Sequence, residues 1–304
     1  MIENGEFPKI SIIIPTYNCA KYIDEAILSA LNQTYSNKEI IIIDDGSKDN
    51  TKDILKKYED NEKVKVVFQE NQGVSKARNN GILIASGEYI ATLDADDRWM
   101  PDRLDKMMSF LKGNPYEIVI SNFYLVDEDR NRLKTSPAFS EDYTHPPKEK
   151  QYKVLLFEAT AFALMIVKKE ILIKLGGYDE TLKGEAEDYD LWLRMLSNDI
   201  HWAFYAEPLV EMMVRTGSLS KGYSTNRKSA LKKIFNKQSH KIGAPRAYLL
   251  YRYHLGGYRL DMLLVSLREK YLPKIVKHIF ILFGSPFFSL AILSKKIFSL
   301  KGRT

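Results

Sequence analysis

The 304-residue sequence predicts an α/β protein with a doubly wound, mostly parallel sheet. Apolar runs that suit strands buried on both faces alternate with segments whose apolar residues recur at helical spacing. The lengths of these segments fit repeated βαβ units. Polar clusters follow three of the runs, at 15–18, 44–47 and 94–97. These three observations indicate an α/β domain in the first part of the chain.

The alternation is clearest over the first ninety residues. Strands are expected at 10–14, 39–43, 63–69 and 88–93, and helices at 21–33, 49–58 and 74–86. In sheets of this kind, ligands bind beyond the carboxyl ends of the strands, where the strand order reverses. The polar clusters PTYN, DDGS and DADD stand at such ends, so we expect them to converge on one side of the sheet.

The pattern is looser after residue 101. We expect a helix at 101–112 with Pro101 in its first turn, strands at 117–121, 123–127 and 163–167, a mobile polar loop at 128–151, and an amphipathic helix at 187–198. From about residue 224 the sequence predicts helices. We therefore divide the chain into a domain at 1–222 and a helical, basic C-terminal region at 223–304.

The net charge of +6 conceals an asymmetry between these two parts. Residues 224–304 contain 17 lysines and arginines but only two acids, which gives +15, whereas residues 1–223 carry −9. A basic segment of this kind suits an anionic membrane surface or another polyanion, or it is simply a solvated helical surface. The single cysteine, Cys19, excludes an intrachain disulfide, which fits a reducing compartment.

The stretch 279–293, IFILFGSPFFSLAIL, contains no charged residue. It is short for a transmembrane span, which needs roughly 20 residues, and lysines flank it on both sides. We interpret it as an interfacial hairpin on an anionic membrane; a pair of core or oligomer-forming helices is the alternative. Because MIENGEFPKI does not resemble a signal peptide, we expect a cytoplasmic protein at the inner face of the cell membrane.

Three carboxylates, those of Asp94, Asp96 and Asp97, follow one apolar strand and repel one another. Carboxylates at this spacing can hold a hard divalent cation through oxygen. Since Mg²⁺ usually takes one or two protein carboxylates and completes its shell with water and phosphates, the motif suggests a phosphate-bearing ligand. The alternative is turn and cap chemistry, with Asp97 capping the helix that begins near Pro101.

Five motifs in order resemble a family 2 glycosyltransferase of the GT-A fold, of the kind that builds bacterial cell-surface glycans. They are ISIIIPTYNCAKYIDEAILSALNQTY, EIIIIDDGSKDNT, NQGVSKARNNGI, GEYIATLDADD and GEAEDYDLWLRM. The resemblance covers roughly residues 8–220. It implies a sheet of the nucleotide-diphospho-sugar transferase type, carrying here a basic helical extension, and an enzyme that inverts the donor's anomeric centre.

The resemblance also assigns residues to the donor nucleotide. Pro15 and Tyr17 match the loop that holds the base, with the Tyr17 ring packed on uracil, and Asp45 would accept a hydrogen bond from the base N–H. Arg78 would balance the diphosphate or fix nearby carboxylates. The alternative for Arg78 is a structural ion pair with Asp45 or Asp94, and both roles can coexist.

Asp94 and Asp96 match the family's metal motif, which implies Mg²⁺ or Mn²⁺. We expect Asp96 to contact the metal directly and Asp94 to bind the ribose or a metal-bound water. Many family members carry a histidine near the metal or diphosphate where this chain has Arg215. An arginine cannot ligate a cation but can bind a diphosphate directly, so the sequence leaves open how strictly the reaction depends on metal.

The family's catalytic base matches the pair Glu187–Asp188. Asp188 would deprotonate the acceptor hydroxyl, and repulsion from Glu187 would raise the pKa of Asp188. The alternative is that these acids merely favour a helix N-terminus. Glu187 and Trp192 are assigned to the acceptor side, although a core position suits Trp192 nearly as well.

The expected reaction moves a sugar from a UDP-sugar to a hydroxyl of a glycan or lipid-linked acceptor, forming a β-linkage during cell-surface polysaccharide synthesis. A nucleotidylyltransferase would need a glycine-rich first loop, which PTYNCAKY lacks. The remaining alternative is a non-catalytic, membrane-peripheral protein that binds a nucleotide-sugar or a polyanion. No nucleic-acid partner is expected, because no nucleic-acid-binding module is recognisable; no oligomeric state is predicted.

Overall fold

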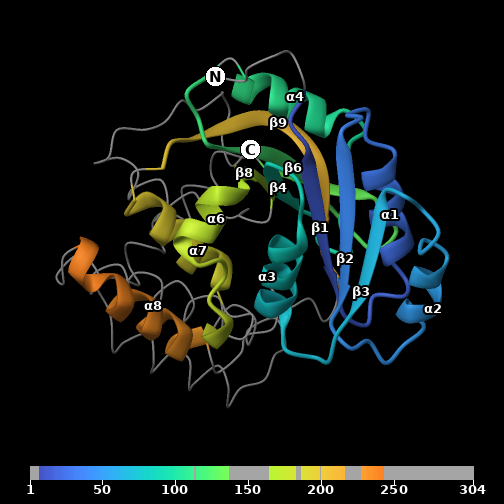
Figure 1. Ribbon diagram of the computed structural model, residues 1–304, viewed down its shortest axis with the longest axis horizontal. Helices are drawn as coiled ribbons and strands as arrows, with labels where there is room; N and C mark the ends of the chain where they lie inside the picture. Colours follow the sequence, from blue (N-terminus) through green and yellow to red (C-terminus); the bar gives the residue numbers. More distant parts are fainter. Residues whose placement is uncertain are drawn as a thin grey trace. The chain divides into compact units, whose positions relative to one another are not determined.

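The computed structural model describes residues 7–112, 114–136, 164–182, 186–198, 200–215 and 227–242. The chain forms two compact units, Met1–Lys221 and Gly222–Thr304. Within the described residues of the first unit, nine strands form one sheet with helices packed against it (Figure 1). The predicted α/β fold class is confirmed.

The first half of the sheet is parallel, in the order β3-β2-β1-β4. Its strands are β1 (Ile10–Thr16), β2 (Lys38–Asp44), β3 (Val64–Phe68) and β4 (Tyr89–Thr92). The isoleucine runs of β1 and β2 are completely buried, since helices cover both faces. All four strands lie where the sequence predicts them.

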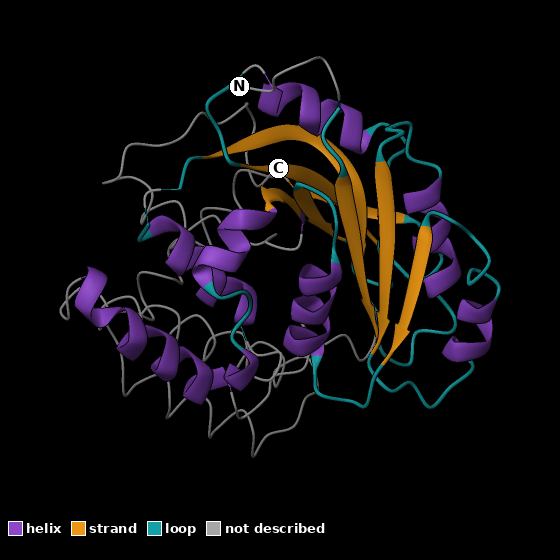
Figure 2. Ribbon diagram, viewed as in Figure 1, coloured by secondary structure: helices purple, strands orange, loops and turns teal. Residues whose placement is uncertain are grey.

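Helices α1 (Ile23–Leu31) and α2 (Thr51–Lys56) cover one face of this half, and α3 (Val74–Ile84) covers the other (Figure 2). The strand order accounts for this arrangement: two right-handed crossovers run outward from β1 to β3, and the third returns past β1 to β4. Helix α3 lies close to the sheet at Gly81, where an added Cβ would lie 2.6 Å from Ile13 Cγ2. The reversal of strand order beside β1 creates the edge where ligands bind in such sheets.

The second half of the sheet is mixed and continues in the order β4-β8-β6-β9-β5. Its strands are β5 (Arg98–Trp99), β6 (Ile118–Val126), β7 (Arg132–Ser136), β8 (Met165–Lys168) and β9 (Trp202–Met213). Strand β6 runs antiparallel to β7 and β8 but parallel to β9. The same part of the chain forms helices α4 (Arg103–Lys112), α6 (Lys169–Leu175) and α7 (Glu187–Leu196), and the short 3₁₀ helix η2 (Glu180–Leu182).

Two expectations for this half were wrong, and one long strand was missed. The two strands expected within 117–127 are one strand, β6, whose pairing with β9 changes register near Asn122. Residues 128–131 of the expected loop form the turn after β6 and residues 132–136 form β7, whereas residues 137–151 lie outside the described residues. Strand β9 was not expected at all.

The second unit is described only by α8 (Arg227–Ile242). Its apolar residues Ala230, Leu231, Ile234 and Phe235 are buried, and Lys232 is exposed. In the part of the chain that the structure describes, no helix combines the length and the apolar character needed to cross a membrane. The apolar stretch 279–293 lies outside that part, so the domain boundary at 222 and membrane association stay predictions.

Glu39, on β2, ties the amino-terminal edge of the parallel sheet together. Its carboxylate accepts hydrogen bonds from Ser11 Oγ at 2.5 Å, from Ser86 N at 2.7 Å and from Lys9 Nζ at 3.1 Å. Burial alone would raise the pKa of Glu39, but these hydrogen bonds together lower it to about 2. The ionised carboxylate therefore stabilises the fold.

We predict that Glu39→Gln lowers the free energy of unfolding at pH 7 by about 2 kcal/mol. The pKa of Glu39 is lower in the folded than in the unfolded chain. The difference in unfolding free energy between wild type and variant is therefore largest above about pH 4.5 and shrinks as the pH falls toward 2. Urea unfolding between pH 2 and 8 measures this difference. The exposed Glu62→Gln is the control, and a loss that stays constant down to pH 2 would contradict the prediction.

Candidate active site

The polar clusters at the carboxyl ends of β1 and β2 are joined directly. Asn18 N donates to Ser47 Oγ at 2.9 Å, and Asn18 Oδ1 accepts from Lys48 N at 2.8 Å. Arg215 reaches the third cluster, because its Nε donates to Asp96 Oδ2 at 2.6 Å while its guanidinium lies beside Cys19. The predicted convergence of the three clusters is confirmed.

The buried guanidinium of Arg78, on α3, holds three carboxylates from two distant parts of the chain. Its Nη2 lies 2.9 Å from Asp94 Oδ1, and its Nη1 lies 2.9 Å from Glu187 Oε1 and 3.2 Å from Asp188 Oδ1. The side chain of Arg78 is 4% exposed. Of the two ion pairs considered for Arg78, the structure therefore contains the one with Asp94, and Arg78 brings it together with the Glu187–Asp188 pair.

Two residues that the sequence analysis did not single out, Tyr178 and Asn79, support the Arg78 side chain. Its guanidinium lies 5.1 Å from the ring centre of Tyr178, a cation–π contact. Asn79, the next residue on α3, accepts from Tyr178 N at 2.8 Å and donates to Tyr178 O at 2.9 Å. At Gly177, where φ is +66°, an added Cβ would lie 2.4 Å from Asn79 Oδ1. The glycines of LGGYDE were the only sequence signal for this turn.

Asp188 is the second residue of α7, whose N-cap residue Ala186 has a left-handed backbone with φ +62°. Burial is the largest influence on its pKa and raises it; Arg78 lowers the pKa, and Glu187 and Asp94 raise it, to a net value of about 7. The side chain still keeps 28% of its surface exposed. A carboxyl group that is accessible and titrates near neutrality is suited to accept a proton.

Asp96 and Asp97, although adjacent, are held in different ways. Burial and the charge of Asp94 raise the pKa of Asp96, and the ion pair with Arg215 lowers it. Asp97 is buried, and its Oδ1 accepts a hydrogen bond from Met213 N of β9 at 2.9 Å. The alternative in which Asp97 caps the following helix is therefore wrong. Its carboxylate instead fastens residues 94–97, the acidic loop, to the sheet.

Asp94 and Asp96 fit a divalent cation. In the described structure each gives one oxygen to an arginine, Oδ1 of Asp94 and Oδ2 of Asp96, which leaves the second oxygen of each for a ligand. Mg²⁺ and Mn²⁺ need few protein carboxylates when a substrate phosphate completes the shell. The described residues contain no group of three or more His, Cys, Asp and Glu side chains placed to hold a metal.

The residues expected to hold the base occupy different environments. Tyr17 follows β1 and is 43% exposed, whereas Pro15 is buried within β1. Asp45 is buried and accepts hydrogen bonds from Gln69 Nε2, Gln72 N and Gly73 N, each at 2.8 Å. Asp45 thus shapes the turn that leads into α3.

The acceptor-side position expected of Trp192 is wrong. Its side chain is 1% exposed and packs edge-to-face on Trp202, with ring centres 5.7 Å apart. Trp192 therefore belongs to the hydrophobic core, although it lies one helical turn after Asp188. Glu187 is 7% exposed and bonded to Arg78, and it therefore helps to fix the guanidinium.

Comparison with known families and curated proteins identifies glycosyltransferases. The family model Glycosyl transferase family 2 matches residues 11–173, more than half of the chain. The putative teichuronic acid biosynthesis glycosyltransferase TuaG of Bacillus subtilis is 30% identical, and the match covers 75% of this chain and 86% of TuaG. An uncharacterized glycosyltransferase of Rickettsia typhi is 36% identical, and the match covers 64% of this chain and 61% of that protein.

Among solved structures, the chain resembles residues 1–349 of TarS from S. aureus, in a crystal structure in complex with UDP-GlcNAc. The TM-score is 0.69 at 20% identity, and the match covers 89% of this chain and 79% of that chain. At this level of identity the likeness establishes the fold, and it agrees with the predicted GT-A type.

We predict that Arg78→Met lowers the free energy of unfolding at pH 7 by about 3 kcal/mol, because three carboxylates lose their shared cation. The loss shrinks as the pH falls and Asp188, whose pKa is about 7, takes up a proton. Chemical denaturation between pH 4 and 8 measures it.

The matched control is Lys76→Met on the same helix. Lys76 forms a more exposed ion pair with Glu180 at 3.3 Å. The substitution Lys76→Met should therefore lower the free energy of unfolding by less than about 1 kcal/mol. Equal losses in the two variants would contradict a central role for Arg78.

Proposed function

The chain belongs to glycosyl transferase family 2, and from this premise we propose that it transfers a sugar from a UDP-sugar to a hydroxyl of a glycan or lipid-linked acceptor, with inversion to a β-linkage. One observation carries the proposal. Arg78 joins Asp94, on the donor side, to Asp188, the candidate base, so both halves of a transfer reaction meet at one buried cation.

The donor nucleotide would lie at the carboxyl ends of β1 and β2. Tyr17, exposed at the end of β1, offers a ring for the base, with Pro15 beneath it in the same segment. Asp45 would contact the base N–H and already fixes the turn before α3. Support for a uridine nucleotide comes from TarS, which has been crystallised in complex with UDP and with UDP-GlcNAc.

Asp94, Asp96 and Arg215 would receive the diphosphate. The two carboxylates would hold Mg²⁺ or Mn²⁺, which when bound supplies positive charge against the leaving diphosphate. Arg215 is 26% exposed and paired with Asp96, so it can turn from that carboxylate to a phosphate oxygen, where a guanidinium binds with two parallel hydrogen bonds. The protein thus supplies cationic charge of its own at this position.

Asp188 would act as general base. The acceptor hydroxyl oxygen forms a bond to the anomeric carbon, the bond from that carbon to the diphosphate oxygen breaks, and Asp188 takes the hydroxyl proton. With a pKa of about 7, a substantial share of Asp188 is ionised at neutral pH. Arg78, which is itself held by Glu187, keeps the carboxyl group in place during the transfer.

We place this reaction in cell-surface polysaccharide synthesis, at the cytoplasmic face of the membrane. Support comes from the name of TuaG, which assigns that relative to teichuronic acid biosynthesis. The charge of residues 224–304 supports association with an anionic membrane. A lipid-linked acceptor would be presented at the same surface.

The donor proposal predicts slow hydrolysis of a UDP-sugar. We expect the purified chain to release UDP from one member of a panel of UDP-, GDP- and dTDP-sugars with Mn²⁺ or Mg²⁺. Asp96→Asn should lose this activity, because it removes one negative ligand, whereas the exposed Asp60→Asn should keep it. Arg215→Gln should deepen the dependence on metal. Failure to bind or turn over any donor would refute the enzyme proposal.

The base proposal predicts a pH profile. The rate of transfer to an acceptor should rise with pH through about 7, as Asp188 loses its proton, and Asp188→Asn should lower the rate by roughly 10³-fold. Glu187→Gln removes a like charge and should move the acid limb to lower pH. Glu62→Gln makes the same charge change at an exposed residue before β3, so the acid limb of its pH profile should stay in place. If the acid limb of the pH–rate profile does not move in Glu187→Gln, Asp188 is not the general base.

A further inference from the structure

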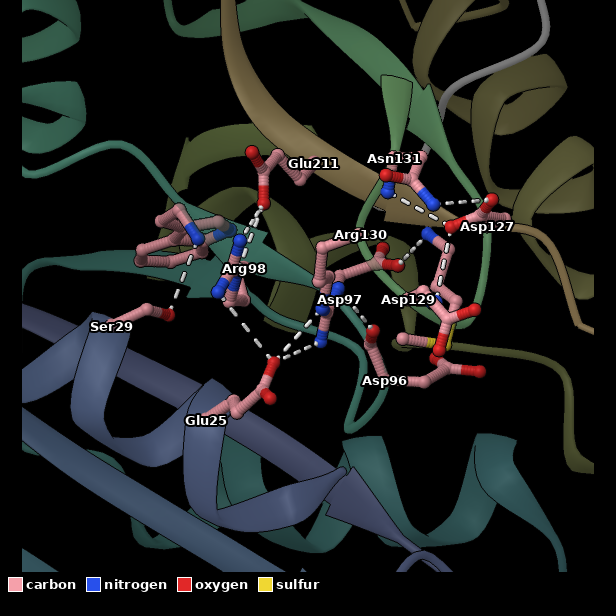
Figure 3. Close-up of polar contacts among 12 residues, drawn as sticks. Glu25, Ser29, Asp96, Asp97, Arg98, Asp127, Asp129, Arg130, Asn131 and Glu211 are labelled. Atoms are coloured by element: carbon pink, nitrogen blue, oxygen red, sulfur yellow. Dashed lines mark hydrogen bonds and ion pairs between the residues drawn. The ribbon is translucent and has the colours of Figure 1, made fainter. Parts of the chain in front are cut away.

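The turn between β6 and β7 places an arginine beside the acidic loop (Figure 3). Asp127 organises this turn, since its Oδ1 accepts from Asp129 N at 3.0 Å and from Asn131 N at 2.8 Å. Between them, Arg130 adopts a left-handed backbone with φ +63°, which costs energy in any residue other than glycine. The turn therefore fixes the direction in which the Arg130 side chain leaves the sheet.

The guanidinium of Arg130 bridges two other parts of the domain. Its Nε donates to Glu25 Oε2, on α1, at 2.8 Å, and its Nη1 donates to the backbone oxygen of Asp96 at 3.1 Å. Glu25 also lies 3.7 Å from Arg98, which in turn binds Glu211 of β9 through Nε at 2.9 Å. Only 12% of the Arg130 side chain is exposed but 47% of the Glu25 side chain is, so solvent screens the pair with Glu25 more than the partly buried contact with the Asp96 backbone.

We propose that Arg130 is a positioning residue, which holds the peptide of Asp96 so that its carboxylate faces the donor diphosphate and its cation. This inference rests on the proposed function. Two arginines hold Asp96, but in different ways: Arg215 occupies a carboxylate oxygen, whereas Arg130 binds the backbone oxygen. Only the contact with Arg215 competes with a metal. When Arg215 turns to the diphosphate, Arg130 keeps Asp96 oriented.

The buried hydrogen bond from Met213 N to Asp97 Oδ1 holds the next residue of the loop. The acidic loop is therefore fixed on both sides of the Asp96–Asp97 peptide. Loss of the Arg130 contact leaves a partly buried backbone oxygen without its donor and allows this peptide to rotate. A ligand carboxylate that loses an outer partner commonly binds its metal 10- to 100-fold more weakly, so roughly a tenfold effect is expected here.

The test measures binding of Mn²⁺ by electron paramagnetic resonance and of UDP by calorimetry, each with and without the other. Arg130→Gln should weaken Mn²⁺ binding in the presence of UDP by roughly tenfold and leave metal-free UDP binding nearly unchanged. Glu25→Gln, which releases the far end of the bridge, should act in the same direction, and the double variant should lose less than the product of the two effects. Arg130→Lys keeps the charge but not the two-ended bridge, and should weaken Mn²⁺ binding to an intermediate extent.

Arg132→Gln is the matched control. Arg132 lies two residues further on, is exposed and packs over the Tyr124 ring at 3.8 Å, so its loss makes the same change in charge and should leave Mn²⁺ binding unchanged. Unchanged Mn²⁺ binding in Arg130→Gln and Arg130→Lys, with only a lower melting temperature, would overturn the inference. If the wild type binds Mn²⁺ with UDP and Asp96→Asn does not, the proposed donor site stands regardless. If the wild type binds neither, both proposals fall.

Discussion

A single buried guanidinium, that of Arg78, brings the end of β4 and the start of α7 together. The carboxylates that meet there come from positions 94, 187 and 188, and without a shared cation their repulsion would separate the two elements. The rest of the site depends on this contact, because it sets both the place of Asp188 and part of the balance that brings its pKa to about 7. Tyr178 matters because its ring packs on the guanidinium, and Asn79 matters because it holds the backbone of Tyr178.

The acidic loop shows how clustered charge is tolerated at the end of a strand. Asp94 pairs with Arg78, Asp96 with Arg215, and Asp97 takes a backbone N–H from β9. Each carboxylate thus has its own partner, one on α3 and two at or just after the end of β9, which offsets the repulsion that the sequence implies. Since Asp94 and Asp96 pair through one oxygen each, the arrangement satisfies the protein and keeps the carboxylates available to a ligand.

The sequence predicted the parallel half of the sheet because buried isoleucine runs and intervening helices leave few other assignments. It failed for β9, whose segment WAFYAEPLVEMM lacks clean alternation because its register with β6 shifts, and for β7, which is short and polar. In the site, motifs located Asp94, Asp96 and Asp188. They could not reveal Asn79 or Arg130, whose roles come from contacts between residues 99 and 34 positions apart. Trp192 was misplaced because helical spacing does not separate a core face from a ligand face.

The contact between Gly177 and Asn79 has a consequence for the history of the family. No side chain fits at 177 while Asn79 holds the backbone of Tyr178, and without that hold the ring behind Arg78 is unsupported. A change at either position therefore brings little benefit alone and acts through the other. Among descendants of a common ancestor, the glycine at 177 and the asparagine at 79 should be retained together. Independent substitution of the two should be found in lineages that have lost Arg78.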